Sequence, residues 1–165
     1  MENVVLIGMP GVGKSTVGVV LAKVLGYQFI DADLLIQKKM NMVLSEIIKK
    51  EGTDGFMKIE NDVNASIETD RTVIATGGSV VYCEEAMEHL KSIGTVIYLK
   101  LSLESLSKRL GNLVGRGVVL KKGQTLEHLY DERTPLYEKY ADLTIDEENQ
   151  ELEDTLQTIL NCYKK

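Results

Sequence analysis

The residues best suited to do chemistry stand in a glycine-rich loop that ends in lysine and serine. The run Gly8–Thr16 fits the pattern Gly-x-x-x-x-Gly-Lys-Ser in full. Glycines let successive backbone N–H groups turn inward around phosphate oxygens, while the lysine reaches the β- and γ-phosphates and the serine ligates Mg²⁺. We therefore predict a nucleoside triphosphate site, formed by Gly11, Val12, Gly13, Lys14, Ser15 and Thr16.

Two aspartates, Asp31 and Asp33, follow the apolar run Tyr27–Ile30. Carboxylates one residue apart at a strand end can point into one crevice, where one holds a Mg²⁺-bound water and the other meets a substrate hydroxyl. The alternative is a helix N-terminus with acidic residues, which stabilises the helix by ~0.3–1 kcal/mol without catalysis. A phosphate loop at the same edge of the fold favours the catalytic interpretation.

Three further segments carry candidate residues. The loop Thr76–Ser79 permits close backbone approach to a ligand, although an ordinary turn is an equal alternative. Residues 111–124 are glycine-rich and are predicted to form a mobile lid whose Arg116 closes on phosphate charge; a solvated surface loop is the alternative. Arg133 lies in a helical segment, where a surface ion pair is the simplest interpretation.

Strands and helices are predicted to alternate along the whole chain. Strands are expected at Val4–Ile7, Tyr27–Ile30, Arg71–Ala75, Thr95–Leu99 and Leu143–Ile145. Helices are expected at Ser15–Leu25, Leu34–Lys50, Gly55–Glu68, Glu84–Lys91, Ser102–Leu110, Leu126–Tyr140 and Gln150–Tyr163. A break is predicted near Met40–Met42 and a kink or break at Pro135. This alternation is typical of a doubly wound parallel sheet, which binds ligands at the carboxyl ends of its strands.

Size and composition limit the possible functions. With 165 residues, the chain is predicted to form a single domain, and its net charge of -6 argues against a nucleic-acid-binding surface. No apolar stretch approaches the ~20 residues that span a membrane. Two widely separated cysteines, Cys83 and Cys162, and no recognisable secretory segment favour a cytoplasmic protein. We expect a monomer that binds a small molecule.

Taken together, these motifs resemble those of the shikimate kinases over nearly the whole chain. The resemblance rests on Gly8–Thr16, Phe29–Asp33, Phe56 with Glu60, Ala75–Gly78, Arg109, Arg116 and Arg133–Tyr137. It implies an α/β three-layer P-loop kinase fold, with a five-stranded parallel sheet flanked by helices, a substrate-binding region at about 32–62 and the lid. The implied reaction is Mg²⁺-dependent transfer of the γ-phosphoryl group of ATP to the 3-hydroxyl of shikimate.

The resemblance also implies roles for individual residues. Lys14 and Ser15 would hold phosphates and metal, with Asp31 supporting the metal through water. Asp33 would orient the accepting hydroxyl and could act as its base, and Arg116 would close on the phosphates. The remaining assignments are Arg109 near adenine, Arg133 on the substrate carboxylate, and Gly77, Gly78 and Ser79 against the substrate.

Three positions depart from the family pattern. The usual Phe-Arg-x-x-Glu contains Met57 in place of the arginine that forms half of the carboxylate clamp. A lost charge-assisted hydrogen bond of ~1.5–3 kcal/mol would weaken shikimate binding by roughly 10- to 150-fold. Ser79 replaces the third glycine of a triplet and is expected to need a backbone angle that favours glycine. Gly117 replaces proline and should loosen the lid.

Three other functions remain open. Met57 and Ser79 allow a kinase of the same type that phosphorylates another small hydroxy acid or a polyol. A catalytically silent nucleotide-binding module is the alternative outside enzymes. A nucleoside monophosphate kinase fits the phosphate loop alone, but the Asp31/Asp33 pair and the short lid argue against it.

Overall fold

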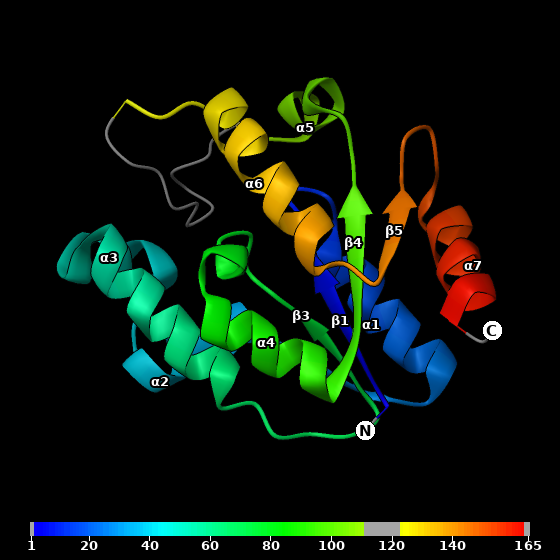
Figure 1. The fold of residues 1–165 in the computed structure, drawn as a ribbon, viewed down its shortest axis with the longest axis horizontal. Helices are drawn as coiled ribbons and strands as arrows, with labels where there is room; N and C mark the ends of the chain where they lie inside the picture. Colours follow the sequence, from blue (N-terminus) through cyan, green and yellow to red (C-terminus); the bar gives the residue numbers. More distant parts are fainter. Residues whose placement is uncertain (1, 111–122, 164–165) are drawn as a thin grey trace.

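The apolar runs form the strands of one parallel sheet in the computed structural model, which describes residues 2–110 and 123–163. The sheet order is β2-β3-β1-β4-β5 (Figure 1). The strands are β1 (Asn3–Ile7), β2 (Gln28–Asp31), β3 (Thr72–Ala75), β4 (Gly94–Lys100) and β5 (Leu143–Asp146). All residues of β1 and β3 are buried, as expected for central strands of a parallel sheet with both faces covered.

Helices cover both faces of this sheet. They are α1 (Lys14–Leu25), α2 (Ala32–Met40), α3 (Leu44–Ala65), α4 (Glu84–Ile93), α5 (Leu103–Arg109), α6 (Leu126–Tyr140) and α7 (Leu152–Tyr163), with a short 3₁₀ helix η1 (Val80–Tyr82). Helices α1 and α7 pack together, while α4 and α6 lie in front of the sheet in Figure 1. The helix pair α2 and α3 lies beside α4 at one end of the molecule. The predicted three-layer α/β architecture is therefore confirmed.

The register of the strands brings three loops to the same level. Ala75 at the end of β3 pairs with Asp31 of β2 on one side and with Leu6 of β1 on the other. The phosphate loop, the aspartate pair and the loop from Thr76 to Ser79 therefore begin side by side at the carboxyl edge. This is the edge at which ligands bind in such sheets.

Two positions of the phosphate loop require glycine, because a side chain there would clash or strain the backbone. Gly8 has φ of 147°, and a Cβ there would lie 2.6 Å from the Leu99 carbonyl oxygen of β4. Gly13 precedes α1 with φ of 92°, in the left-handed region. The loop can thus lie against the sheet and then turn directly into α1, whose Val17 and Leu21 are buried.

The substrate-side helices differ from their predicted bounds. The break near Met40–Met42 is confirmed, since α2 ends at Met40 and Asn41 adopts a left-handed φ of 51°. The separate helices predicted to end at Lys50 and to begin at Gly55 are confirmed in outline, because α3 joins two helical segments across Gly52, whose backbone is not helical. The second segment ends at Ala65, three residues before the predicted Glu68. Glycine tolerates the φ of 73° at this kink, where the first helical segment gives way to the second.

Pro135 does not end α6, which continues to Tyr140, so the predicted break there is wrong. Arg133 and Tyr137 on either side of the proline are buried, and their packing holds the segment in place. The 3₁₀ helix η1 was not predicted. The predicted lid lies outside the described residues apart from 123 and 124. None of the helices in the described part of the chain is long and apolar enough to cross a membrane.

Candidate active site

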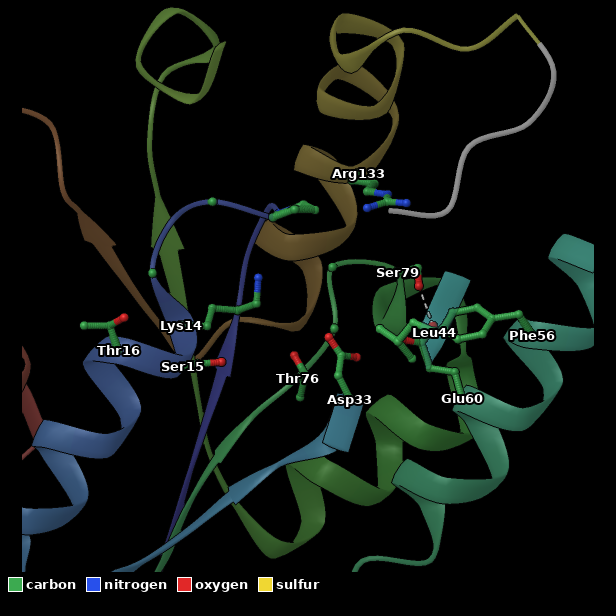
Figure 2. A pocket seen from close by; sticks show the side chains of 15 residues that line it. Lys14, Ser15, Thr16, Asp33, Leu44, Phe56, Glu60, Thr76, Ser79 and Arg133 are labelled. Carbon is green, nitrogen blue, oxygen red and sulfur yellow. Dashed lines mark hydrogen bonds between the residues drawn. The ribbon is translucent and has the colours of Figure 1, made fainter. Parts of the chain in front are cut away.

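A cavity of about 420 Å³ lies where the three loops meet at the carboxyl edge of the sheet (Figure 2). Segments far apart in the sequence contribute to its wall. The lining residues are Pro10, Gly11, Gly13, Lys14, Ser15, Thr16, Asp33, Leu44, Phe56, Glu60, Thr76, Gly77, Gly78, Ser79 and Arg133. The phosphate loop and the predicted substrate residues therefore share one cavity.

Lys14 lies inside the curve of the phosphate loop (Figure 2). Its Nζ donates to the carbonyl oxygens of Gly8 at 2.6 Å and Met9 at 3.0 Å. Burial lowers the pKa of Lys14 to about 8, an effect that Asp33 opposes. The cation is thus held at the site where the loop amides would receive phosphate oxygens.

Asp31 caps a helix and also contacts the phosphate loop. Its Oδ1 accepts hydrogen bonds from the backbone N–H groups of Asp33 and Leu34 and caps α2. Its Oδ2 accepts one from the Ser15 hydroxyl at 2.8 Å. The two predicted metal-site residues are therefore adjacent, and their oxygens are of the hard type that Mg²⁺ prefers.

These residues fit a shared Mg²⁺ site better than a closed protein cage. The described residues contain no group of three or more histidines, cysteines, aspartates or glutamates that could hold a metal. Magnesium is usually held by one or two carboxylates together with substrate phosphates and water. Ser15 and Asp31 match that arrangement beside the phosphate loop.

Asp33 lies on the cavity wall facing the loop (Figure 2). Burial raises the pKa of Asp33 to about 6; the Asp31 carboxylate adds to this shift and Lys14 opposes it. A carboxyl group with a pKa this close to neutrality can accept a proton from a substrate hydroxyl more readily than an ordinary aspartate.

Glu60 of α3 lines the cavity, although the motifs assign it no role of its own. Its side chain is buried, and its Oε1 accepts a hydrogen bond from the Ser79 hydroxyl at 2.5 Å. Burial raises the pKa of Glu60 to about 7, while the Ser79 hydrogen bond lowers it. One signal in the sequence could have found it, because Phe56 and Glu60 are four residues apart and share a helix face.

The backbone at Ser79 corrects one expectation. Its φ of -91° lies in the right-handed region, so this position does not require glycine. The expected hydroxyl is present in the cavity wall, where Ser79 contacts Glu60.

Arg133 is not a surface ion pair, because its side chain is only 1% exposed. Its Nε donates to the Tyr82 hydroxyl at 3.3 Å, and its guanidinium lies 5.4 Å from the centre of the Tyr82 ring. The neighbouring Tyr137 donates to the carbonyl oxygen of Gly78 at 2.6 Å, which ties α6 to the glycine loop. A buried guanidinium on a cavity wall is suited to bind a carboxylate.

Gly77 and Gly78 allow the charged side chains to approach the loop. A Cβ at Gly77 would lie 2.7 Å from both Asp33 Oδ1 and Glu60 Oε2. A Cβ at Gly78 would lie 3.0 Å from Arg133 Nη1 and 2.8 Å from Pro10. Both glycines are thus needed where the sequence predicted close backbone approach.

Arg109 and Glu147 lie beside the phosphate loop outside this cavity. Arg109 Nη1 donates to the Gly11 carbonyl oxygen at 3.2 Å. Glu147 is 5% exposed, and none of the described residues hydrogen-bonds its Oε2. Burial raises the pKa of Glu147 to about 7, and the charges of Arg109 and Lys14 oppose this shift.

Some predicted residues do not line the cavity. Among the described residues these are Val12, Asp31, Arg109 and Met57. Met57 does not line it; together with Arg133 and Tyr82 it lines a smaller neighbouring cavity of about 70 Å³. Arg116 lies outside the described residues. The cavity wall therefore combines most of the predicted residues of the phosphate and substrate sides, while Asp31 contacts it through Ser15 and Arg109 through Gly11.

The fold and the cavity define a phosphate-binding-loop kinase that acts on a small molecule. The shikimate kinase family model matches residues 10–164, so the chain belongs to the shikimate kinase family.

Individual relatives agree with this assignment. A shikimate kinase of Thermodesulfovibrio yellowstonii is 38% identical over 100% of this chain and 96% of its own. A shikimate kinase of Clostridium botulinum is 40% identical, over 100% of this chain and 98% of its own. The structure of shikimate kinase from Acinetobacter baumannii in complex with shikimate superposes with a TM-score of 0.88 at 34% identity, covering 98% of this chain and 92% of that one.

Gly77→Ala should disable the acceptor side of the cavity. The new Cβ would force Asp33 and Glu60 apart, and a displacement of about 1 Å at a reacting group lowers turnover by roughly 10²-fold. Steady-state kinetics measure the loss, and binding of Mg²⁺-ATP should remain because the phosphate loop is untouched. Unchanged turnover would contradict this geometry.

Glu147→Gln should stabilise the protein at alkaline pH. The pKa of this carboxyl is raised on folding from 4.5 to about 7, so folding becomes less favourable as pH rises through that interval. The substitution changes the free energy of unfolding relative to wild type, and this change should be about 1–3 kcal/mol more stabilising at pH 8 than at pH 5. Urea unfolding at both pH values tests this, with the exposed Glu151→Gln as matched control. Equal effects of both substitutions would show that burial of Glu147 does not carry the effect.

Proposed function

We propose that the protein transfers the γ-phosphoryl group of ATP to the 3-hydroxyl of shikimate with Mg²⁺. The observation that carries this proposal is the single cavity that joins the phosphate loop to Asp33, Glu60 and Arg133. Membership of the shikimate kinase family supports the choice of reaction, and the relative with shikimate bound supports the choice of acceptor.

On the nucleotide side, loop amides and Lys14 would hold the phosphates. Lys14 would exchange its bonds to the Gly8 and Met9 carbonyl oxygens for phosphate oxygens. Ser15, with Asp31 acting through water, would hold Mg²⁺. Bound there, Mg²⁺ would neutralise charge on the β- and γ-phosphate oxygens. Arg109 near adenine and Arg116 on the phosphates remain assignments from the family resemblance.

On the acceptor side, Asp33 would orient the hydroxyl that receives the phosphoryl group and take its proton. Its burial and a pKa of about 6 support this role near neutral pH. Arg133 would bind the carboxylate across the cavity, held in place by Tyr82. The backbone at Gly77 and Gly78 would contact the substrate between these two groups.

The structure bears on the alternative of another hydroxy acid or a polyol. Met57 lies in the smaller cavity next to Arg133, so the family's arginine is missing while the other half of the clamp is in place. A carboxylate-bearing acceptor therefore fits the cavity better than an uncharged polyol. The intact Lys14, Ser15, Asp31 and Asp33 likewise favour an active kinase over a silent nucleotide-binding module.

The surroundings of the enzyme are inferred from the sequence. Both cysteines are free, Cys83 buried and Cys162 exposed, which supports a reducing, cytoplasmic setting. We expect a monomer without nucleic-acid partners.

Lys14→Ala and Asp33→Asn should each abolish transfer to shikimate. The first removes the cation from the phosphate loop, and the second removes the base but keeps the shape of the side chain. A coupled assay for ADP release should detect turnover in wild type and at least roughly 10²-fold less in each variant. Normal turnover of Asp33→Asn would remove this residue from the mechanism.

We expect wild type to turn shikimate over and Met57→Arg to lower the KM for shikimate by roughly tenfold. The reason is that the new guanidinium would add a second contact to the carboxylate. Met57→Leu is the matched control, since it changes shape without adding charge. If only Met57→Arg accepts shikimate and wild type accepts a different hydroxy acid, the proposed acceptor is wrong.

A further inference from the structure

Two departures from the family pattern converge on one buried carboxyl group. Met57 precedes Glu60 by three residues on α3, so the helix turn that would supply a cation beside Glu60 supplies a thioether instead. Ser79 supplies the hydrogen bond that Glu60 Oε1 accepts at 2.5 Å. Glu60 is thus held by a neutral hydroxyl, and no salt bridge to it is formed within the described residues.

The charged groups around Glu60 come from several elements. Asp33 of α2 faces it across Gly77, and Arg133 of α6 and Lys14 of α1 act on it from farther along the cavity. Cys83, just before α4, also interacts with Glu60: burial raises the pKa of its thiol, and the charge of Glu60 adds to this shift. Burial and Asp33 disfavour the ionised carboxylate, whereas Ser79 and the two cations favour it.

Glu60 shares the cavity wall with the two groups that would bind the acceptor. Asp33 Oδ1 and Glu60 Oε2 each lie 2.7 Å from the position of a Cβ at Gly77. Arg133 Nη1 lies 3.0 Å from the corresponding position at the next residue, Gly78. Glu60 therefore lies on the same wall as Asp33, and Arg133 borders the next residue of the loop.

We propose that Glu60, held by Ser79, is a specificity-determining residue that donates a hydrogen bond from its protonated carboxyl group to the carboxylate of the acceptor. Ionised Glu60 has no proton to donate and repels the same anion. The pair Glu60–Ser79 then takes the place of the missing cation only while Glu60 is protonated. This inference rests on the proposed function, because it requires an acceptor that carries a carboxylate.

Binding of shikimate between pH 6 and 9, measured by isothermal titration calorimetry, tests the proposal. In wild type, affinity should fall by roughly 10- to 100-fold as Glu60 loses its proton, with the midpoint near pH 7. Glu60→Gln keeps a donor that does not titrate and should lose most of this dependence. Any dependence that Glu60→Gln retains belongs to Asp33 or Lys14, so the difference between the two proteins is the quantity of interest.

Two further measurements keep the test valid if Glu60→Gln folds poorly. Ser79→Ala removes a hydrogen bond that favours ionised Glu60, so the fall in affinity should move to higher pH. The carboxamide of shikimate carries no charge, and its binding to wild type should change much less with pH.

The outcomes separate this inference from the proposed function. Two results would overturn the inference alone, provided that wild type binds and phosphorylates shikimate. The first is the same pH dependence of binding in wild type and Glu60→Gln, and the second is a midpoint that does not move in Ser79→Ala. Failure of wild type to bind or phosphorylate shikimate at any pH would count against the proposed function and, with it, the inference.

Discussion

The parallel register of three strands determines where the chemistry of this protein takes place. Asp31 and Leu6 pair with the same residue, Ala75, so the loops after β1, β2 and β3 leave the sheet at one level. Each loop contributes a different kind of group: backbone amides with Lys14, carboxylates, and glycines without side chains. Because parallel strands end at a common edge, groups far apart in the sequence meet without any long excursion of the chain. The close approach of Gly8 to Leu99 then places the phosphate loop against this edge.

This convergence brings charge into a region with little water. Lys14, Glu60 and Arg133 are buried, and Asp33 faces the first two across the cavity. Isolated buried charges are costly, so such groups persist where opposite charges and hydrogen bonds compensate. The pKa shifts reflect this balance, because burial moves the pKa of Lys14 down and those of Asp33 and Glu60 up. The groups are thereby poised to exchange protons and partners near neutral pH, as a cavity that receives a triphosphate and a hydroxy acid requires.

The sequence predicted those parts of the structure that local chemistry controls. The phosphate loop was found because each of its residues has a backbone or charge requirement of its own, and the bounds of α6 followed from its apolar period. The interruption at Gly52 also follows from local chemistry, since this glycine adopts non-helical backbone angles between the two segments of α3. The role of Glu60 was missed, because a glutamate in a polar helical stretch looks exposed. Only the tertiary approach of Ser79 and Gly77 shows that it is buried in the cavity wall.

The same tertiary contacts explain how the chain accommodates the loss of an arginine at Met57. The methionine contributes to the small cavity beside Tyr82 and Arg133, where an apolar side chain packs without leaving a charge unpaired. Arg133 does not rely on that position, since Tyr82 contacts it and Tyr137 anchors its helix to Gly78. The Ser79 hydroxyl donates a hydrogen bond to Glu60, and the φ of Ser79 is one that a residue with a side chain can adopt. Met57 of the helix and Ser79 of the loop therefore both belong to the acceptor side, whereas the phosphate loop itself matches its pattern in full.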